Sequence, residues 1–488
     1  MSDVIIKKKN EVYLQLKTPP HISYELSDHF TFEVEGAQFM PAYRKKYWDG
    51  KIRLFSPGTG EIYAGLREYI EQFCQERHYT YNYVDNEFFG MPDAEDELVS
   101  FDGVKSFTKR FSSIKAREYQ YTAIYEALRK KRKLIVSPTG SGKSFMIYSI
   151  VRFLQETGQK IIIVVPTTSL VEQMYKDFIS YGWDAEQFCH KVYAGHEKIS
   201  PKPVTITTWQ SIYKQHRKYF ECFNAVIGDE AHLFKAKSLT DILTKLHHAK
   251  YRIGFTGTLD GSKTNKLVLE GLFGPHKKIT NTNELIQQGH LSRLKIKILT
   301  LRHPHIKFDT YQDEIDYIIS HPKRNNFIKN LALDLGGNTL ILFNYVERHG
   351  EPLYELINSS VKNSRKVFFV HGGVDAKDRE EIREITEHES NAIIIASYGT
   401  FSTGINIKNL HNIIFASPSK SRVRNLQSIG RVLRRGENKN TALLYDIADD
   451  TSKDSNNPNY TLKHLFERVK IYNQENFDYE IINVKLKQ

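Results

Sequence analysis

Leu134-Ile-Val-Ser-Pro-Thr-Gly-Ser-Gly-Lys-Ser-Phe145 is the segment from which the expected fold follows. An apolar, strand-like run comes first, a glycine-containing loop follows, and the helical pattern Phe145–Leu154 comes next. This is the context in which a P-loop holds phosphates, because its glycines let backbone N–H groups turn inward and the helix N-terminus attracts negative charge. Ser137 stands where the usual pattern has Gly, which loosens the pattern but not the mechanism. The segment predicts a nucleotide-binding α/β domain.

The residue types in this loop suit ATP and Mg²⁺, which we expect as cofactors. Lys143 is long enough to reach the β- and γ-phosphates, and the Ser144 hydroxyl is an oxygen ligand for the metal. The nucleotide contacts expected from the loop are Pro138, Thr139, Gly140, Ser141, Gly142, Lys143 and Ser144.

A pair of acids follows another strand-like run, about one α/β domain further on. Asp229-Glu230-Ala231-His232 comes directly after Ala225–Ile227. Carboxylates at the C-terminal end of a buried strand lie where α/β folds bind ligands. Asp229 would hold Mg²⁺ through its water, and Glu230 would act as general base on the attacking water. The alternative is a solvated helix start, where acids favour the helix dipole; the P-loop upstream favours the catalytic interpretation.

Continuous apolar runs, separated by helical patterns, fill two successive regions. They are Leu134–Val136, Ile161–Val165, Val204–Ile206, Ala225–Ile227 and Arg252–Phe255, then Leu340–Phe343, Val367–Val370, Ala392–Ala396, Asn412–Ala416 and Thr441–Tyr445. Such runs suit strands buried on both faces of a parallel sheet, so two doubly wound α/β domains are expected. The predicted division is 1–95, a small N-terminal α/β domain that binds nucleic acid; 96–280 and 281–450, the two larger domains; and 451–488, a C-terminal helical extension. The acidic stretch Gly90–Glu97 is interpreted as a linker.

Composition narrows the class of protein. The 488 residues carry a net charge of +12 with a pI near 9.2, which points to a polyanionic partner or simply to a basic protein. The three cysteines form no C-x-x-C pair, so neither a disulfide framework nor a zinc site is expected. The N-terminus lacks the apolar run of a signal peptide, and no membrane span is expected, which fits the cytoplasm.

Basic and aromatic residues alternate within the N-terminal domain. We expect nucleic-acid contacts from Arg44, Lys45, Lys46, Trp48, Lys51 and Arg53. Lysine and arginine neutralise phosphates, and an indole offers a stacking face. The alternative is that Tyr47 and Trp48 are core aromatics and the charges form a solvated rim; residue preference favours a core position for Trp48.

The order of motifs between about 115 and 450 resembles that of superfamily 2 helicases of the DEAH type. The similar segments are Arg117-Glu-Tyr-Gln120 (adenine-reading), Pro166-Thr-Thr-Ser-Leu170 with Gln173 (Ia), Thr207-Thr-Trp-Gln210-Ser (Ib), Thr256-Gly-Thr258 (III), His371-Gly372 (IVa), Ser402-Thr-Gly404-Ile-Asn406 (V) and Gln427-Ser-Ile-Gly430-Arg431-Val-Leu-Arg434 (VI). The resemblance implies two RecA-like domains with one ATP site between them.

The same resemblance implies roles for individual residues. It assigns nucleotide binding to Arg117, Gln120, Gly404 and Asn406, and catalysis to Gln427, Arg431 and Arg434 together with Lys143, Asp229 and Glu230. It assigns the coupling of hydrolysis to movement to His232, Thr256 and Thr258. It assigns contacts with nucleic acid to Thr167, Trp209, Gln210, His371, Gly372 and Thr400. Three of these have plain structural alternatives. Arg434 can belong to a surface basic patch, His371 can be an ordinary loop histidine, and Trp209 can fill the core of the first domain.

The chain is similar to the recombination and repair helicases of T4-like bacteriophages in three segments taken together. These are Tyr47-Trp-Asp-Gly-Lys-Ile-Arg-Leu-Phe55, the DEAH segment and Gln427–Arg434. That resemblance covers nearly the whole chain. It implies ATP-dependent unwinding and branch migration of forks, Holliday junctions, R-loops and D-loops. The implied partners are branched DNA, RNA–DNA hybrids, and single-strand-binding and recombination proteins; we expect a monomer in the host cytoplasm.

Two other classes share some of these motifs. A motor subunit of a restriction or nuclease complex would carry the same ATPase, although we find no carboxylate–lysine nuclease pattern in the tails. A non-enzymatic sensor would clamp nucleic acid without unwinding it, but Glu230 and Arg434 are both present, which speaks against an inactive ATPase.

Overall fold

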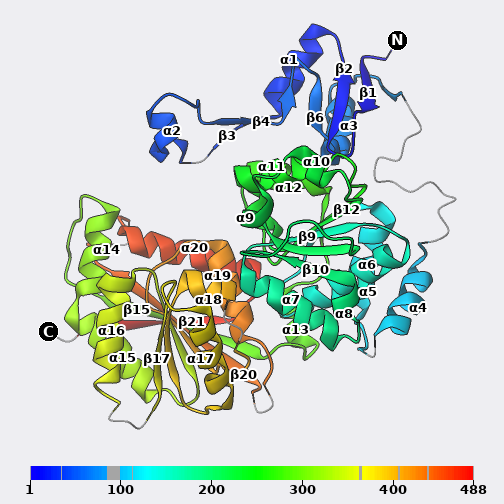
Figure 1. The fold of residues 1–488 in the computed structure, drawn as a ribbon. Helices are drawn as coiled ribbons and strands as arrows, with labels where there is room; N and C mark the ends of the chain where they lie inside the picture. Colours follow the sequence, from blue (N-terminus) through cyan, green and yellow to red (C-terminus); the bar gives the residue numbers. More distant parts are fainter. Residues whose placement is uncertain are drawn as a thin grey trace. The chain divides into compact units, whose positions relative to one another are not determined.

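The computed structural model describes residues 2–34, 36–84, 99–112, 114–361, 365–404, 407–436, 439–454 and 456–486. They form two compact units, one from 1–137 with 142–279, and one from 280–488 grouped with 138–141 (Figure 1). No helix in these described ranges is both long and apolar enough to cross a bilayer. The predicted linker Gly90–Glu97 lies outside the described residues.

The first unit is built on a seven-stranded parallel sheet of order β10-β11-β9-β12-β13-β8-β14. Its strands are β8 (Arg132–Val136), β9 (Ile161–Val165), β10 (Cys189–Val192), β11 (Val204–Thr208), β12 (Ala225–Gly228), β13 (Tyr251–Thr256) and β14 (His276–Lys278). The principal helices are α4 (Phe101–Phe111), α5 (Glu118–Lys130), α6 (Lys143–Glu156), α7 (Thr168–Ser180), α9 (Trp209–Ile212), α11 (Lys237–Lys245) and α12 (Lys263–Phe273).

Strand β9 shows why this sheet needs continuous apolar runs. Ile161, Ile163 and Val165 belong to one hydrophobic core, whereas Ile162 and Val164 belong to another. Successive side chains of a strand point to opposite faces, so both faces of the sheet are covered. The predicted doubly wound α/β architecture is confirmed for this unit.

The second unit repeats the plan with sheet order β17-β18-β16-β19-β20-β15-β21, again all parallel. Its strands are β15 (Arg293–Arg302), β16 (Thr339–Phe343), β17 (Val367–Val370), β18 (Ile393–Ser397), β19 (Asn412–Phe415), β20 (Thr441–Asp450) and β21 (Tyr479–Lys485). The principal helices are α14 (Tyr311–Ser320), α15 (Pro322–Asp334), α16 (Glu351–Asn358), α17 (Ala376–His388), α18 (Tyr398–Gly404), α19 (Arg422–Val432) and α20 (Tyr460–Gln474). Two RecA-like sheets are thus present, as predicted.

The C-terminal extension is more than the helix that was predicted. Helix α20 confirms the helical pattern of Thr461–Tyr472, but the chain then returns as β21. This strand pairs with β15 from Ile296↔Tyr479 to Arg302↔Lys485. The extension is therefore part of the second sheet, because its last strand forms the edge of that sheet.

The N-terminal module is a five-stranded mixed sheet of order β5-β6-β2-β1-β7. Its elements are β1 (Val4–Lys8), β2 (Tyr13–Lys17), α1 (Pro20–His29), β5 (Phe55–Ser56), β6 (Glu61–Tyr63), α3 (Arg67–Glu76) and β7 (Tyr81–Tyr83). The module packs on the first large sheet through a buried ion pair, Arg132 Nη2 to Glu11 Oε2 at 2.7 Å. Tyr69 also donates to Glu270 at 2.6 Å. These contacts explain why the small domain belongs to the first compact unit.

A two-stranded ribbon leaves this module. It consists of β3 (Thr31–Glu33) and β4 (Lys51–Arg53), with a 3₁₀ turn (Ala37–Phe39) and the short helix α2 (Pro41–Arg44) between them (Figure 1). The strand-like pattern predicted at Phe30–Val34 is confirmed. The ribbon carries the basic and aromatic residues that the sequence singled out.

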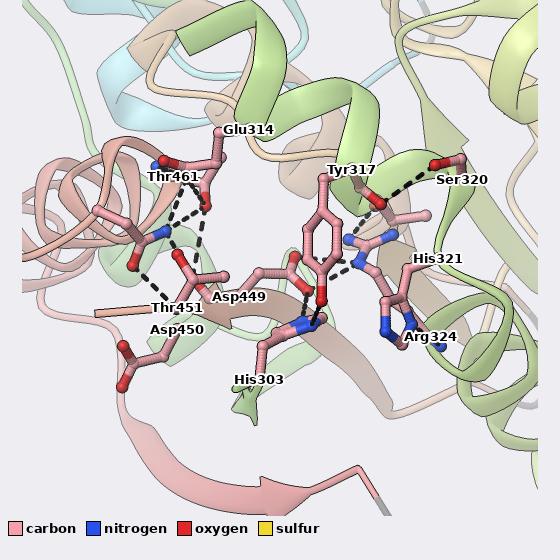
Figure 2. Close-up of polar contacts among 12 residues, drawn as sticks. His303, Glu314, Tyr317, Ser320, His321, Arg324, Asp449, Asp450, Thr451 and Thr461 are labelled. Atoms are coloured by element: carbon pink, nitrogen blue, oxygen red, sulfur yellow. Dashed lines mark hydrogen bonds and ion pairs between the residues drawn. The ribbon is translucent and has the colours of Figure 1, made fainter. Parts of the chain in front are cut away.

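Charged side chains buried in the second unit tie three of its elements together. Arg324 of α15 donates from Nε to both oxygens of Asp449, at 2.8 and 3.0 Å, and His303 Nε2 lies 2.9 Å from Asp449 Oδ1 (Figure 2). Burial raises the pKa of Asp449, but the Arg324 charge and the His303 hydrogen bond outweigh it and hold that pKa at about 2. Asp449 therefore stays ionised and joins β20, α15 and the end of β15.

Replacing Asp449 by Asn is expected to lower the free energy of unfolding of the second unit by about 3–5 kcal/mol, because Arg324 would stay buried without its counter-charge. Urea denaturation of the full chain, with hydrogen exchange of β20, measures the loss. The matched control is Asp316→Asn, whose partner is Arg348 in a half-exposed pair and which should cost about 0–1 kcal/mol. Equal losses for the two variants would contradict the prediction.

The stabilisation that ionised Asp449 contributes in the wild-type chain should be fully present above its unfolded pKa of about 3.9 and be lost as pH falls toward 2.

Candidate active site

The P-loop follows β8 directly and leads into α6, as the sequence predicted. Gly140 and Gly142 adopt left-handed backbone conformations, with φ of 84° and 82°. Side chains rarely tolerate that conformation, so these two glycines allow the turn. The Ser137 N–H donates to Thr256 O at 2.9 Å, and Lys143 Nζ donates to Ser137 O at 3.3 Å. The lysine is thus held over its own loop at the start of a 14-residue helix.

Gln120 lies against this loop. A Cβ built on Gly142 would come within 2.4 Å of Gln120 Nε2, so the loop glycine and the glutamine amide are in direct contact. The Arg117 N–H donates to Gln120 Oε1 at 2.9 Å, and Arg117 Nη1 donates to Tyr119 Oη at 2.7 Å. The segment predicted to read adenine is therefore placed beside the phosphate loop.

The two acids lie at the carboxyl end of β12. Asp229 accepts a hydrogen bond from the Glu230 N–H at 2.9 Å, and Glu230 has a left-handed φ of 51°. A non-glycine residue in that region is strained and is more common at functional sites. Burial raises the pKa of Asp229, repulsion from Glu230 raises it further, and Lys143 opposes both. Lys143 and Asp229 thus interact electrostatically within the same unit.

His232 connects the acids to the segment Thr256–Thr258. Its Nδ1 lies 3.4 Å from Glu230 Oε2 and 3.1 Å from Thr256 Oγ1. Thr256 Oγ1 in turn donates to Thr258 O at 3.0 Å. Burial lowers the pKa of His232, so this imidazole is neutral at physiological pH. The three residues predicted to couple hydrolysis to movement form one continuous chain of contacts.

The donor set suits Mg²⁺. Hydroxyl and carboxylate oxygens are the ligands this ion prefers, and the burial of Asp229 makes a bound cation favourable for its ionised form. Within the described ranges, no group of three or more His, Cys, Asp or Glu side chains is placed to hold a metal by itself.

The second unit carries the predicted arginines on and after α19. Gln427 and Arg431 lie on this helix, Arg434 follows it, and all three are partly buried. The Arg431 guanidinium lies 5.7 Å from the centre of the Phe401 ring. Lys439 donates to Arg434 O at 3.1 Å and also to Val432 O, which holds the end of the helix. The arginines are therefore half-buried on a braced helix end and not scattered over a loose surface patch.

The predicted motif V falls partly outside the described residues. Asn406 is not described, and of Gly404 only its place at the end of α18 is described. Thr400, at the start of the same segment, accepts a hydrogen bond from Ser397 Oγ at 2.9 Å and is 6% exposed.

The predicted nucleic-acid residues lie at the carboxyl ends of strands in each sheet. Thr167 follows β9 and caps α7, and Trp209 and Gln210 follow β11; Gln210 Nε2 donates to Pro166 O at 3.4 Å. In the second unit, His371 and Gly372 follow β17, and the Gly373 N–H donates to His371 Nδ1 at 3.2 Å. Trp209 is half-buried against the core and near Tyr213, so core packing accounts for part of its surface.

The ribbon residues are exposed, and one expectation about them is wrong. Arg44, Lys45 and Lys46 are exposed, as predicted for phosphate contacts, whereas Lys51 and Arg53 form ion pairs with Glu33 and Asp49. The core alternative is wrong for Tyr47, which is 84% exposed. Trp48 is partly buried and its indole N–H donates to Lys51 O at 2.8 Å, so its contact with nucleic acid stays a prediction. The reason is that the ribbon projects from its module, so the tip has no core to fill.

Sequence reasoning missed three further exposed side chains of the same tip, Phe39, Met40 and Tyr43, of which Phe39 is 68% exposed. Their aromatic and apolar character beside a basic run was the available signal. Large exposed apolar side chains gathered at one place are typical of a binding surface.

Comparison with known proteins places these features in a family. Residues 3–85 match the family described as DNA helicase UvsW, N-terminal; residues 113–261 match Type III restriction enzyme, res subunit; and residues 322–436 match Helicase conserved C-terminal domain. The ATP-dependent DNA helicase uvsW of Enterobacteria phage T4 is 34% identical over 95% of this chain and 96% of its own length. The chain belongs to the UvsW helicase family.

Solved structures agree with membership of the UvsW family. The crystal structure of T4 UvsW covers 99% of this chain and 100% of its own, with 31% identity and a TM-score of 0.53. A fragment of an HsdR subunit of a type I restriction enzyme from Vibrio vulnificus covers 90% of this chain at 17% identity and a TM-score of 0.58, which shows a shared fold alone. A DNA 3'-5' translocase of Sulfurisphaera tokodaii is 25% identical over 70% of this chain.

Proposed function

We propose that this chain is an ATP-dependent DNA helicase and translocase that remodels branched nucleic acids, including forks, Holliday junctions, R-loops and D-loops. The observation that carries the proposal is the contact chain Glu230–His232–Thr256, since it links the proposed general base with the segment to which the family resemblance assigns coupling. The full-length likeness to a phage helicase supports the choice of DNA as substrate.

In the proposed reaction, Lys143 binds the β- and γ-phosphates, and Glu230 accepts a proton from the attacking water. Mg²⁺, held by Ser144 and Asp229, would supply positive charge to the phosphates. Arg431 and Arg434 would neutralise the charge that spreads over the transferred phosphoryl group. Gln120 beside Gly142 would select adenine.

Movement requires that ATP and its products favour different conformations of the protein. We expect His232 to transmit the change, because its ring contacts both Glu230 and Thr256. The residues at the carboxyl ends of β9, β11, β17 and β18 would grip one strand of nucleic acid in alternation. Repeated cycles would then advance the protein along that strand.

The ribbon supplies the contact with branched DNA in this proposal. Exposed Lys45 and Lys46 would bind phosphates, and the exposed rings of Phe39 and Tyr47 would stack on bases that are unpaired at the branch. We propose further that the chain works as a monomer in the host cytoplasm, with single-strand-binding and recombination proteins as partners.

Lys45→Ala combined with Lys46→Ala is expected to weaken binding to a four-way junction and to reduce the salt slope of binding by about 1.8, because two phosphate contacts are lost. Fluorescence anisotropy across a salt series measures the slope. The control is Lys7→Ala with Lys17→Ala, which removes the same charge from exposed positions of the N-terminal sheet. The control should leave the salt slope unchanged. If the Lys45 and Lys46 double variant also leaves it unchanged, the ribbon does not contact DNA phosphates.

Strand displacement across forked, four-way and RNA–DNA hybrid substrates tests the function itself. The wild-type chain should unwind them with ATP, and Glu230→Gln should bind them without unwinding. Absence of ATP-dependent displacement on every substrate, despite DNA-stimulated hydrolysis, would reject a helicase and leave a translocase or clamp.

The motor subunit of a restriction or nuclease complex is the second candidate. The match of residues 113–261 to a restriction-enzyme family favours it only within the first large domain. The N-terminal match and the end-to-end likeness to the phage helicase favour the first proposal. Co-purification with a nuclease or methylase would reverse that preference.

A further inference from the structure

A cavity of about 590 Å³ lies in the second unit, between the segment after β15 and the loop that joins β20 to α20. Its lining includes Lys307, Phe308, Lys453, Tyr460 and Lys463. None of the motifs identified in the sequence accounts for this cavity.

The acids near the cavity are already engaged. Glu314 accepts hydrogen bonds from the N–H groups of Tyr460 and Thr461, at 2.8 and 2.7 Å, and so caps α20; Figure 2 shows its side chain facing Thr461. Asp454 accepts from the N–H groups of Asn456 and Asn457 within its own loop. The cavity lining carries three lysines, Lys307, Lys453 and Lys463, against these two acids, so its formal charge is positive by one and favours an anion.

One wall of the cavity is fixed in position by Thr451. Thr451 is fully buried, yet its Oγ1 has no hydrogen-bond partner among the described residues. Its backbone carbonyl is held by His305 Nδ1 at 3.0 Å, so the residue is fixed in position. That hydroxyl is closed to solvent, so Thr451 supports the wall and the ligand contacts fall to the lysines and Tyr460.

The cavity lies at the carboxyl ends of β15 and β20, the edge of a parallel sheet at which α/β folds bind ligands. His371 and Thr400 follow β17 and β18 at the same edge. From β17 to β15 the sheet order counts five strand spacings, roughly 24 Å, which several nucleotides can span.

We propose that this cavity is a subsite for one nucleotide unit of a single DNA strand. Lys453 and Lys463 neutralise its phosphates, and the Tyr460 ring stacks on the base. Lys463 Nζ lies over that ring, 5.6 Å from its centre, so the base would stack on the opposite face with a positive charge close by, a combination that single-strand binding sites use. This inference rests on the proposed function and extends its nucleic-acid track beyond the recognised motifs.

The test measures binding of fluorescein-labelled oligo-dT by anisotropy across a salt series. Lys453→Ala with Lys463→Ala should reduce the salt slope by about 1.4 and weaken binding roughly 25-fold at 0.1 M salt, because two single-strand phosphate contacts are lost. Tyr460→Leu should weaken binding about tenfold without changing the slope, since stacking releases no counterions. Lys470→Ala, on the same helix but paired with Glu467, should retain wild-type binding. Each variant must keep the wild-type thermal unfolding midpoint.

Two results would overturn the subsite. One is a wild-type slope and affinity in the double-lysine variant. The other is binding of free dTMP that the variants lose while oligo-dT binding stays intact, because the cavity would then take a mononucleotide and not a strand. Failure of the wild-type chain to unwind any branched substrate rejects the proposed function instead, and that measurement is independent of the salt slope.

Discussion

Lys143→Ala is expected to reduce DNA-stimulated ATP turnover by about a hundred- to a thousandfold. Removing one preorganised group that stabilises transition-state charge costs about that much in other enzymes. Lys143 starts α6 and lies over its own loop, so no other described lysine of the loop replaces it. Steady-state ATPase with and without branched DNA measures the effect.

The control for this variant is Lys109→Ala, an exposed lysine of α4 that should leave turnover unchanged. Binding of a fluorescent ATP analogue separates loss of affinity from loss of chemistry. Wild-type turnover by Lys143→Ala would remove the P-loop assignment and, with it, the motor.

Arg434→Ala is expected to lower kcat by about 10³–10⁵-fold while nucleotide binding persists, the range that arginine fingers contribute in other NTPases. The residue is half-buried, and Lys439 holds its carbonyl, so its position is defined before nucleotide binds. Single-turnover hydrolysis measures the chemical step without interference from product release.

The adjacent Arg435→Ala is the matched control, because Arg435 is exposed and carries the same charge. Arg434→Lys should recover only part of the rate, since an ammonium lacks the planar fork of a guanidinium. Equal rates for Arg434→Ala and Arg435→Ala would assign the role to another residue, with Arg431 the first to test.

Local sequence predicted the strands that lie inside each sheet. A strand buried on both faces needs an apolar side chain at nearly every position, and β9 and β16 show that pattern with all five residues buried. The edge strand β21 has mostly exposed side chains and was not predicted. Its pairing with β15 joins residues about 180 positions apart, and no short-range pattern encodes such a partner.

The candidate active site also has parts that local sequence predicted and parts that depend on long-range packing. The P-loop and the acid pair follow from sequence, because each is a local turn attached to its own strand. The contact between His232 and Thr256 does not, since it depends on β12 and β13 being neighbours in the sheet. A core position was the alternative for Tyr47, but the projecting ribbon leaves that residue 84% exposed.

By itself, the sequence determined the fold class, the phosphate loop and the order of the motifs, because hydrophobic periodicity and loop chemistry act over a few residues. Only the tertiary structure decided that the N-terminal module packs on the first sheet, that the chain's last strand completes the second, and that a basic cavity forms after β20. Those features depend on which surfaces far apart in the chain exclude water together, and burial of that kind has no local signature.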